Sequence, residues 1–107
     1  MVLVKAEKRA DAAARTAYLL RIHSYLDIAI VSMWTASPRV DVMLGMAEAS
    51  LRGEGPGEDD EETLRQVRAL AGEARGHQAG GDSTAAMGRM RVALDLLALH
   101  IIRLSGE

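Results

Sequence analysis

Two pairs of side chains that can bind a metal ion stand four residues apart along the chain. His23 precedes Asp27, and Glu73 precedes His77. Because residues four apart share one face of an α-helix, each pair would present an imidazole nitrogen beside a carboxylate. Two such faces brought together in a bundle would offer a divalent metal two nitrogens and two carboxylates. The four residues are therefore a candidate metal site, and the simpler alternative is that each pair is a surface ion pair.

His100 differs from the other two histidines because apolar residues surround it in the sequence. Its neighbours are Leu96, Leu97, Leu99, Ile101 and Ile102. A histidine near the C-terminal end of a small bundle resembles the iron ligand of haem-binding four-helix bundles, which implies noncovalent haem held by His100. The alternative is a buried or interface histidine hydrogen-bonded to a carboxylate such as Asp27 or Asp95. The residues favour this alternative, and no cofactor is expected.

Composition excludes several other classes of function. The chain has 107 residues, a net charge of −2 and no cysteine, so disulfides, thiolate metal sites and cysteine nucleophiles are absent. The charge gives no general attraction to nucleic acid. A nucleic-acid role would rest only on Arg68, Arg75, Arg89 and Arg91, and it is disfavoured. The charged N-terminus has no secretory signal pattern, and no apolar run approaches the ~20 residues of a membrane span. A cytoplasmic protein that does not enter a membrane is therefore expected.

Breakers and apolar periodicity divide the chain into four predicted helices. The first runs from about residue 3 to residue 36, where the Ser37-Pro38 step disfavours helix. A shorter second helix, with Pro38 in its first turn, ends before Gly53. A glycine-rich loop over residues 53–62 closes with an acidic run, whose carboxylates complement the positive end of the third helix. The third helix ends at the glycines at positions 76, 80 and 81, and Asp82 or Ser83 caps the fourth.

Each predicted helix has apolar residues at three- and four-residue steps, which mark its inward face. These residues are Leu19, Ile22, Leu26, Ile30 and Met33 in the first helix, Val40, Leu44, Ala47 and Leu51 in the second, Leu64, Val67, Ala71 and Ala74 in the third, and Met87, Met90, Leu94, Leu97, Ile101 and Leu104 in the fourth. The first helix also has an alanine stripe, expected to permit close helix approach. It consists of Ala6, Ala10, Ala13 and Ala17.

The fourth helix has apolar residues on further faces, so it is expected to be surrounded by protein. These additional residues are Val92, Leu96, Leu99 and Ile102. The expected architecture is an all-α, four-helix, mainly antiparallel bundle with a long first helix, forming one domain over residues 1–107. A homodimer with the first and fourth helices in its interface would complete this bundle.

No set of residues supplies a nucleophile, a base and a charge stabiliser together. The sequence therefore predicts a small non-enzymatic helical interaction or regulatory module that acts through protein–protein contacts. Trp34, with Met33 beside it, is the candidate partner-binding residue, and its alternative role is a lid over the bundle end. Two other functions stay open: a metal- or haem-binding bundle, possibly enzymatic, and a weak nucleic-acid-binding regulator that uses the arginines of the third and fourth helices.

Overall fold

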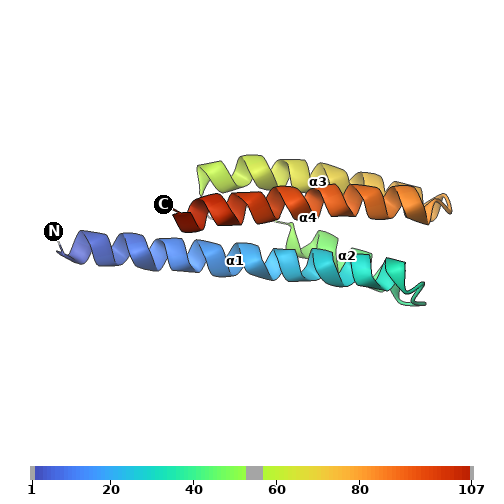
Figure 1. Cartoon of the computed structure of the whole chain (residues 1–107), viewed down its shortest axis with the longest axis horizontal. Coiled ribbons are helices and arrows are strands. Elements are labelled where there is room, and N and C mark those ends of the chain that lie inside the picture. The colour runs from blue at the N-terminus through green and yellow to red at the C-terminus, as the bar shows by residue number, and fades with distance from the viewer. Residues whose placement is uncertain (1, 53–56, 107) are drawn as a thin grey trace.

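The computed structural model describes the backbone of residues 2–52 and 57–106 and the side chains of residues 12–52, 57 and 59–106. Within these ranges all regular structure is α-helical (Figure 1). The helices are α1 (Val2–Trp34), α2 (Val40–Ser50), α3 (Glu58–Ala79) and α4 (Ser83–Gly106). The prediction of an all-α protein with four helices, the first of them long, is confirmed.

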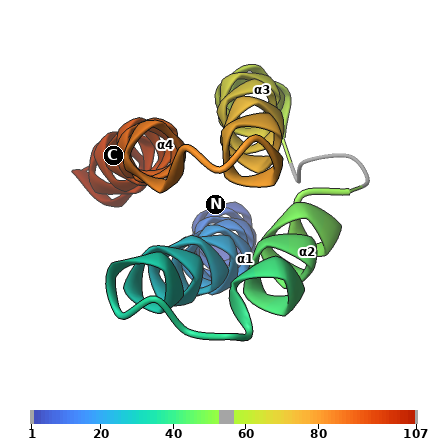
Figure 2. The same ribbon diagram turned by 90° about the vertical axis from the view of Figure 1, so that its right-hand side faces the viewer.

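Successive helices run in opposite directions and stand at the corners of a square (Figure 2). Helix α1 packs against α2 and α4, and α3 packs against the same two helices. The backbones of the diagonal pairs, α1 with α3 and α2 with α4, do not approach each other in the described part of the chain. The result is an elongated antiparallel bundle with extents of 56 × 22 × 21 Å.

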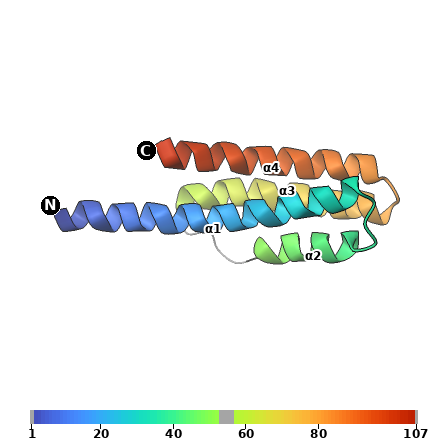
Figure 3. The ribbon, with the colours of Figure 1, turned by 60° about the horizontal axis from the view of Figure 1, so that its bottom comes forward.

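The four helices differ greatly in length. Helix α1 has 33 residues, and α2 has only 11. Helix α2 therefore lies beside the C-terminal part of α1 only, and the N-terminal end of α1 extends beyond the C-terminus of α4 (Figures 1 and 3). Part of α1 consequently has fewer neighbours than a helix of an evenly built bundle.

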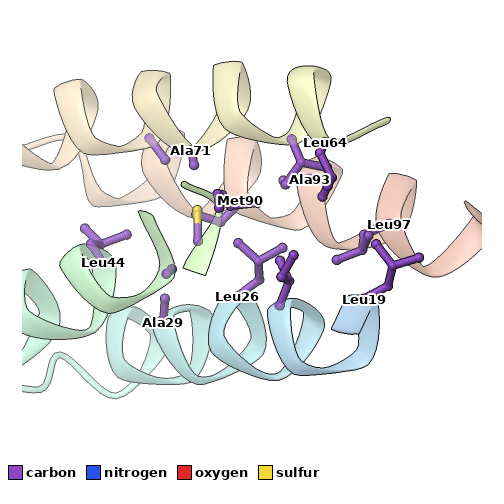
Figure 4. Close-up of a cluster of buried hydrophobic side chains, with 14 of the residues drawn as sticks. Leu19, Leu26, Ala29, Leu44, Leu64, Ala71, Met90, Ala93 and Leu97 are labelled. Atoms are coloured by element: carbon purple, nitrogen blue, oxygen red, sulfur yellow. The ribbon is translucent and has the colours of Figure 1, made fainter. Parts of the chain in front are cut away.

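The core is made of aliphatic side chains from all four helices (Figure 4). All the predicted inward residues are buried except Ile30, Met87 and Leu94, which are partly buried and pack against the core. Alanines alternate with the larger residues and let the backbones come close together. They are Ala29, Ala47, Ala71, Ala74, Ala86 and Ala93.

Helices α1 and α3 end with the same hydrogen-bond pattern, in which a residue in the left-handed conformation stops the helix. At the end of α3 this residue is Gly81, with φ of +83°. The backbone N–H of Gly81 donates to the Gln78 carbonyl at 3.1 Å, and that of Asp82 donates to the His77 carbonyl at 2.9 Å. The predicted stop at residues 80 and 81 is confirmed, whereas Gly76 lies inside the helix and does not end it.

At the end of α1 the left-handed residue is an alanine, Ala36, with φ of +52°. Its N–H donates to the Met33 carbonyl at 3.1 Å, and the N–H of Ser37 donates to the Ser32 carbonyl at 2.8 Å. Pro38 lies in the turn before α2. The expectation that this proline occupies the first turn of the second helix is wrong, because the chain needs these residues to reverse direction.

The predicted starts of the last two helices have different outcomes. The loop ends earlier than residue 62, because α3 begins at Glu58 and includes the acidic run. Asp82 caps α4, since its Oδ1 atom accepts a hydrogen bond of 3.0 Å from the Ala85 N–H. This bond confirms one of the two predicted caps and satisfies a backbone donor of the first turn.

Two expectations about packing, for the alanine stripe of α1 and for the coverage of α4, do not hold in one copy of the chain. Ala13 and Ala17 are exposed, so no other helix of the chain packs on that part of the alanine stripe; Ala6 and Ala10 lie outside the described side chains. Helix α4 is not surrounded by protein either. Three of its large apolar residues are exposed: Val92, Leu99 and Ile102.

Candidate functional site

A buried ionic network joins three of the four helices. The carboxylate of Asp60, in the first turn of α3, has no solvent exposure. Arg15 of α1 donates to it from Nε at 2.9 Å and from Nη2 at 3.0 Å, one bond to each oxygen. The Nε2 atom of His100, in α4, lies 2.6 Å from Oδ1 of the same carboxylate. The long Arg15 side chain thus connects two helices whose backbones stand at diagonal corners of the bundle.

The position of Asp60 follows from the periodicity of α3. Asp60 precedes Leu64 by four residues and Val67 by seven, so it lies on the same inward stripe as these two core residues. Gly57, at the N-cap of α3, leaves room above the carboxylate. A Cβ atom at position 57 would lie 3.2 Å from Asp60 Oδ2 and 3.3 Å from Arg15 Cζ.

Burial by itself would raise the pKa of Asp60, because desolvation penalises the charged carboxylate. The hydrogen bonds from Arg15 and His100, together with their positive charges, outweigh this effect and hold the pKa of Asp60 below its ordinary value. Asp60 therefore stays ionised inside the bundle, and its charge is neutralised by a bidentate guanidinium.

Two other carboxylates of the acidic run pair with arginines of the same helix. Glu61 accepts a bond of 2.7 Å from Nη1 of Arg68, whose Nε also donates to the Leu51 carbonyl at 2.6 Å. Arg68 thereby fastens the end of α2 to α3. Glu62 lies 3.0 Å from Arg65, in an exposed pair of the kind that contributes little stability. The acidic run was predicted to cap the third helix and complement its dipole, and the buried contacts of Asp60 with α1 and α4 were missed.

A pocket of about 360 Å³ opens beside His100 at this end of the bundle. Its walls carry Arg15, Asp59, Glu62, Thr63, His100, Arg103 and Leu104. Positive and negative groups are mixed there, so the pocket does not select one charge of ligand. Among the described residues, no hydroxyl group is hydrogen-bonded to His100. The network therefore contains no nucleophile–base pair, and what its geometry accomplishes is to hold α1, α3 and α4 in register.

His100 was expected to be either a haem ligand or a buried histidine bonded to Asp27 or Asp95. The structure places its side chain at 15% exposure, with Nε2 engaged by Asp60. The partner is thus a different carboxylate from the two that were predicted, because Asp27 and Asp95 both lie on exposed surfaces. An iron atom would have to compete with the Asp60 carboxylate for this nitrogen.

The four predicted metal ligands lie on the diagonal helices α1 and α3. Asp27 is exposed, and Glu73 lies 3.3 Å from Nε of Arg89 on α4. Among the side chains that the structure describes, no group of three or more His, Asp and Glu residues is arranged to hold a metal ion. The pairs His23–Asp27 and Glu73–His77 are therefore not brought together here.

Three of the four arginines considered for nucleic-acid binding already face carboxylates. Arg68 pairs with Glu61, Arg75 lies 3.3 Å from Glu48, and Arg89 pairs with Glu73. These pairs neutralise most of the charge that a phosphate backbone would need.

The predicted partner-binding residues separate into one buried and one exposed side chain. Met33 belongs to the core, at 5% exposure, whereas Trp34 is 78% exposed. Trp34 is therefore not a lid over the bundle end. Its exposure in a chain with only three aromatic residues marks it as an unusual surface feature.

Trp34 belongs to a larger apolar surface on the side of α1 that points away from the core. We call this surface the α1 outer face. It consists of Ala13, Ala17, Leu20, Ile28, Val31 and Trp34, all of them exposed. A groove of about 320 Å³ adjoins Ile28 and Val31 and extends to Met43 of α2. The exposed residues of α4 have the charged Asp95 between Val92 and Leu99, as the α1 outer face has Asp27 between Leu20 and Val31.

The chain was compared with models of protein families, with curated proteins and with solved structures, and none of them matches it. In the described part of the chain, none of the helices combines the length and apolar character required to cross a membrane.

Proposed function

We propose that this protein is a non-enzymatic helical interaction module that assembles as a homodimer and acts through protein contacts made by the α1 outer face. The observation that carries the proposal is the exposure of Trp34, 78%, in line with Val31 at 52% and Ile28 at 49%. Scattered surface apolar residues are ordinary, but a contiguous row that includes a tryptophan is typical of an interface.

The lack of a converging chemical site supports the same proposal. The buried polar network of Asp60 with Arg15 and His100 joins three helices. The bundle core is filled by apolar side chains from all four helices. An interaction module needs a packed scaffold and an exposed apolar surface, and this molecule has both.

The test uses Trp34 as its own reporter, because it is the only tryptophan of the chain. We expect iodide to quench Trp34 fluorescence weakly in concentrated protein and strongly after dilution. We also expect light scattering on a sizing column to give twice the chain mass of 11.5 kDa at high concentration. Both results follow if protein covers the α1 outer face in the assembled state.

Two substitutions of the same residue type locate the contact. Val31 on α1 is 52% exposed and Val92 on α4 is 46% exposed. Val31→Asp places a charge on the α1 outer face and is expected to give the single-chain mass, with Trp34 open to iodide. Val92→Asp serves as the matched control and is expected to behave like the original protein.

Two results would contradict this proposal. One is a single-chain mass with unchanged quenching at every concentration. The other is loss of the dimer in Val92→Asp with no loss in Val31→Asp, which would place the contact on α4.

A further inference from the structure

We infer that the α1 outer face binds the same face of a second copy of this chain in an antiparallel arrangement, an inference that rests on the proposed function. The starting observation is that the face has two unlike halves. Ala13, Ala17 and Leu20 occupy its N-terminal half, and Ile28, Val31 and Trp34 occupy its C-terminal half. The N-terminal half is therefore shallow at its outer end, where the two alanines lie, and the C-terminal half projects outward along its length.

An antiparallel copy places the projecting half of each helix on the shallow half of the other. If the two-fold axis passes between Ser24 and Asp27, Leu20 faces Val31 of the second copy, and Ala17 faces its Trp34. Interhelical distance depends on the side chains at the contact, and alanine opposite a large residue keeps that distance even along the seam.

A parallel copy would fit less well. Trp34 would then meet Trp34 of the second copy, while Ala17 met Ala17. The helices would be forced apart at one end and leave a gap at the other, which loses packing contacts that a dry interface needs. The difference in size between the halves therefore favours the antiparallel pairing, which is also self-complementary, as a two-fold interface requires.

Two polar residues of α1 fit the same arrangement. Asp27 is seven residues from both Leu20 and Trp34, so it lies on the α1 outer face itself. His23, four residues before Asp27, lies at the edge of the face. Neither has a hydrogen bond or an ion pair among the described residues. The antiparallel register brings His23 of each copy beside Asp27 of the other, which forms two imidazole–carboxylate contacts per dimer. This pairing also gives a use to two residues that the sequence had suggested as metal ligands.

The bundle leaves room for this contact. Helix α1 is the longest helix, and in the described part of the chain its backbone has only α2 and α4 as neighbours, so one side of it is left without a helix (Figures 2 and 3). From residue 13 to residue 34 the face is about 32 Å long at about 1.5 Å per residue. A seam of this length corresponds to roughly six helical turns, which is comparable to a short coiled coil.

Disulfide cross-linking tests the register directly, because the natural chain contains no cysteine. Ala17→Cys and Thr35→Cys are made as separate variants, and both positions are exposed. In the antiparallel dimer, residue 17 of one copy lies beside residue 35 of the other. Equal amounts of the two variants, mixed and oxidised, are expected to form a covalent dimer. Each variant alone is expected to remain uncrosslinked, because identical positions are then about 25 Å apart, beyond disulfide reach.

Ala69→Cys, on the exposed side of α3, is the control for random collisions, and it should not cross-link with any variant. Light scattering of the reduced cysteine variants should show the same dimer as the original protein. Adding Val31→Asp to both cysteine variants should abolish the cross-link, with a dimer dissociation constant raised about tenfold or more.

The outcomes separate this inference from the proposed function. If the original protein dimerises and Val31→Asp prevents it, but Ala17→Cys cross-links to itself, the pairing is parallel, so this inference is wrong while the proposed function stands. If the dimer forms and no cross-link appears in any mixture, the register is again wrong while the function stands. If the original protein is a single chain throughout, both are wrong.

Discussion

The imidazole of His100 and the carboxylate of Asp60 lie 2.6 Å apart, although 40 positions separate them in the sequence. Arg15, 45 positions before Asp60, holds the same carboxylate through two further bonds. All three contacts exist only when α1, α3 and α4 are assembled. The network therefore depends on the tertiary fold and should respond as a unit to substitution.

Removal of the Asp60 carboxylate should destabilise the bundle. Asp60→Ala takes the buried carboxylate away from the Arg15 guanidinium and the His100 imidazole. Removal of one member of such a buried ion pair lowers the free energy of unfolding by about 3 kcal/mol, and by less where a partner is partly exposed, as Arg15 is. We expect a loss of about 2–3 kcal/mol in the free energy of unfolding, measured by urea denaturation.

Asp59→Ala is the matched control for this change, because Asp59 is the exposed neighbour of Asp60. It should alter the free energy of unfolding by less than about 0.5 kcal/mol. Equal losses in both variants would mean that general helix-end electrostatics, rather than the buried network, accounts for the effect.

The lowered pKa of Asp60 predicts how stability depends on pH. Unfolded aspartate has a pKa near 3.9, and the folded value is lower, so the unfolded chain binds the proton more readily. The stabilisation is therefore fully present above about pH 5 and is lost as the pH falls through 3.9 towards the folded value. Urea titrations at a series of pH values should show this loss in the original protein.

In Asp60→Asn the free energy of unfolding should fall less steeply below pH 5 than in the original protein, since position 60 no longer titrates. The free energies of unfolding of the two proteins should therefore approach each other as the pH falls. Parallel curves over the whole range would show that other carboxylates cause the acid sensitivity.

The fold and the core were predictable because local periodicity determines which side of a helix is buried. Leu64 and Val67, for example, repeat at the spacing of one helix face, and both are fully buried. Asp60 continues that stripe one turn earlier. The prediction failed to include it because a carboxylate at a helix start has a sufficient local explanation, and only the tertiary structure shows which cation reaches it.

The surfaces were harder to predict because apolar periodicity does not distinguish burial within a chain from burial between chains. Ala17 and Leu99 were expected to be covered, and both are exposed. The arrangement of the helices decides this outcome: within the described residues, the backbone of α1 packs on α2 and α4, and its remaining side has no neighbouring helix.

The alanine that ends α1 predicts a stabilising substitution. Ala36 has φ of +52°, which costs an L-residue about 1–2 kcal/mol, whereas glycine adopts this conformation freely. Glycine also loses more backbone entropy on folding, which offsets part of the gain. Ala36→Gly should therefore raise the free energy of unfolding by about 0.5–1 kcal/mol and the melting temperature by a few degrees.

The reverse change at the end of α3 is the control for Ala36→Gly. Gly81 has φ of +83°, and a Cβ atom added there would meet no other atom within 4 Å. Gly81→Ala should therefore lose about 1 kcal/mol through backbone conformation alone. If both variants shift the melting temperature in the same direction, helix-end conformation does not govern these sites.

Two leucines on one helix provide the most direct check of the bundle itself. Leu97 has no solvent exposure, whereas Leu99 is 51% exposed, two residues further along α4. Leu97→Ala removes two buried methyl groups and the carbon that bears them, and leaves a cavity between α4 and α1, which should cost about 2–5 kcal/mol. Leu99→Ala should change the free energy of unfolding by less than about 0.5 kcal/mol when measured on the single chain. Urea denaturation in the Val31→Asp background separates this comparison from any dimer, because that variant is expected to be a single chain. A similar loss for both leucines would mean that α4 is enclosed on two sides, contrary to the arrangement described above.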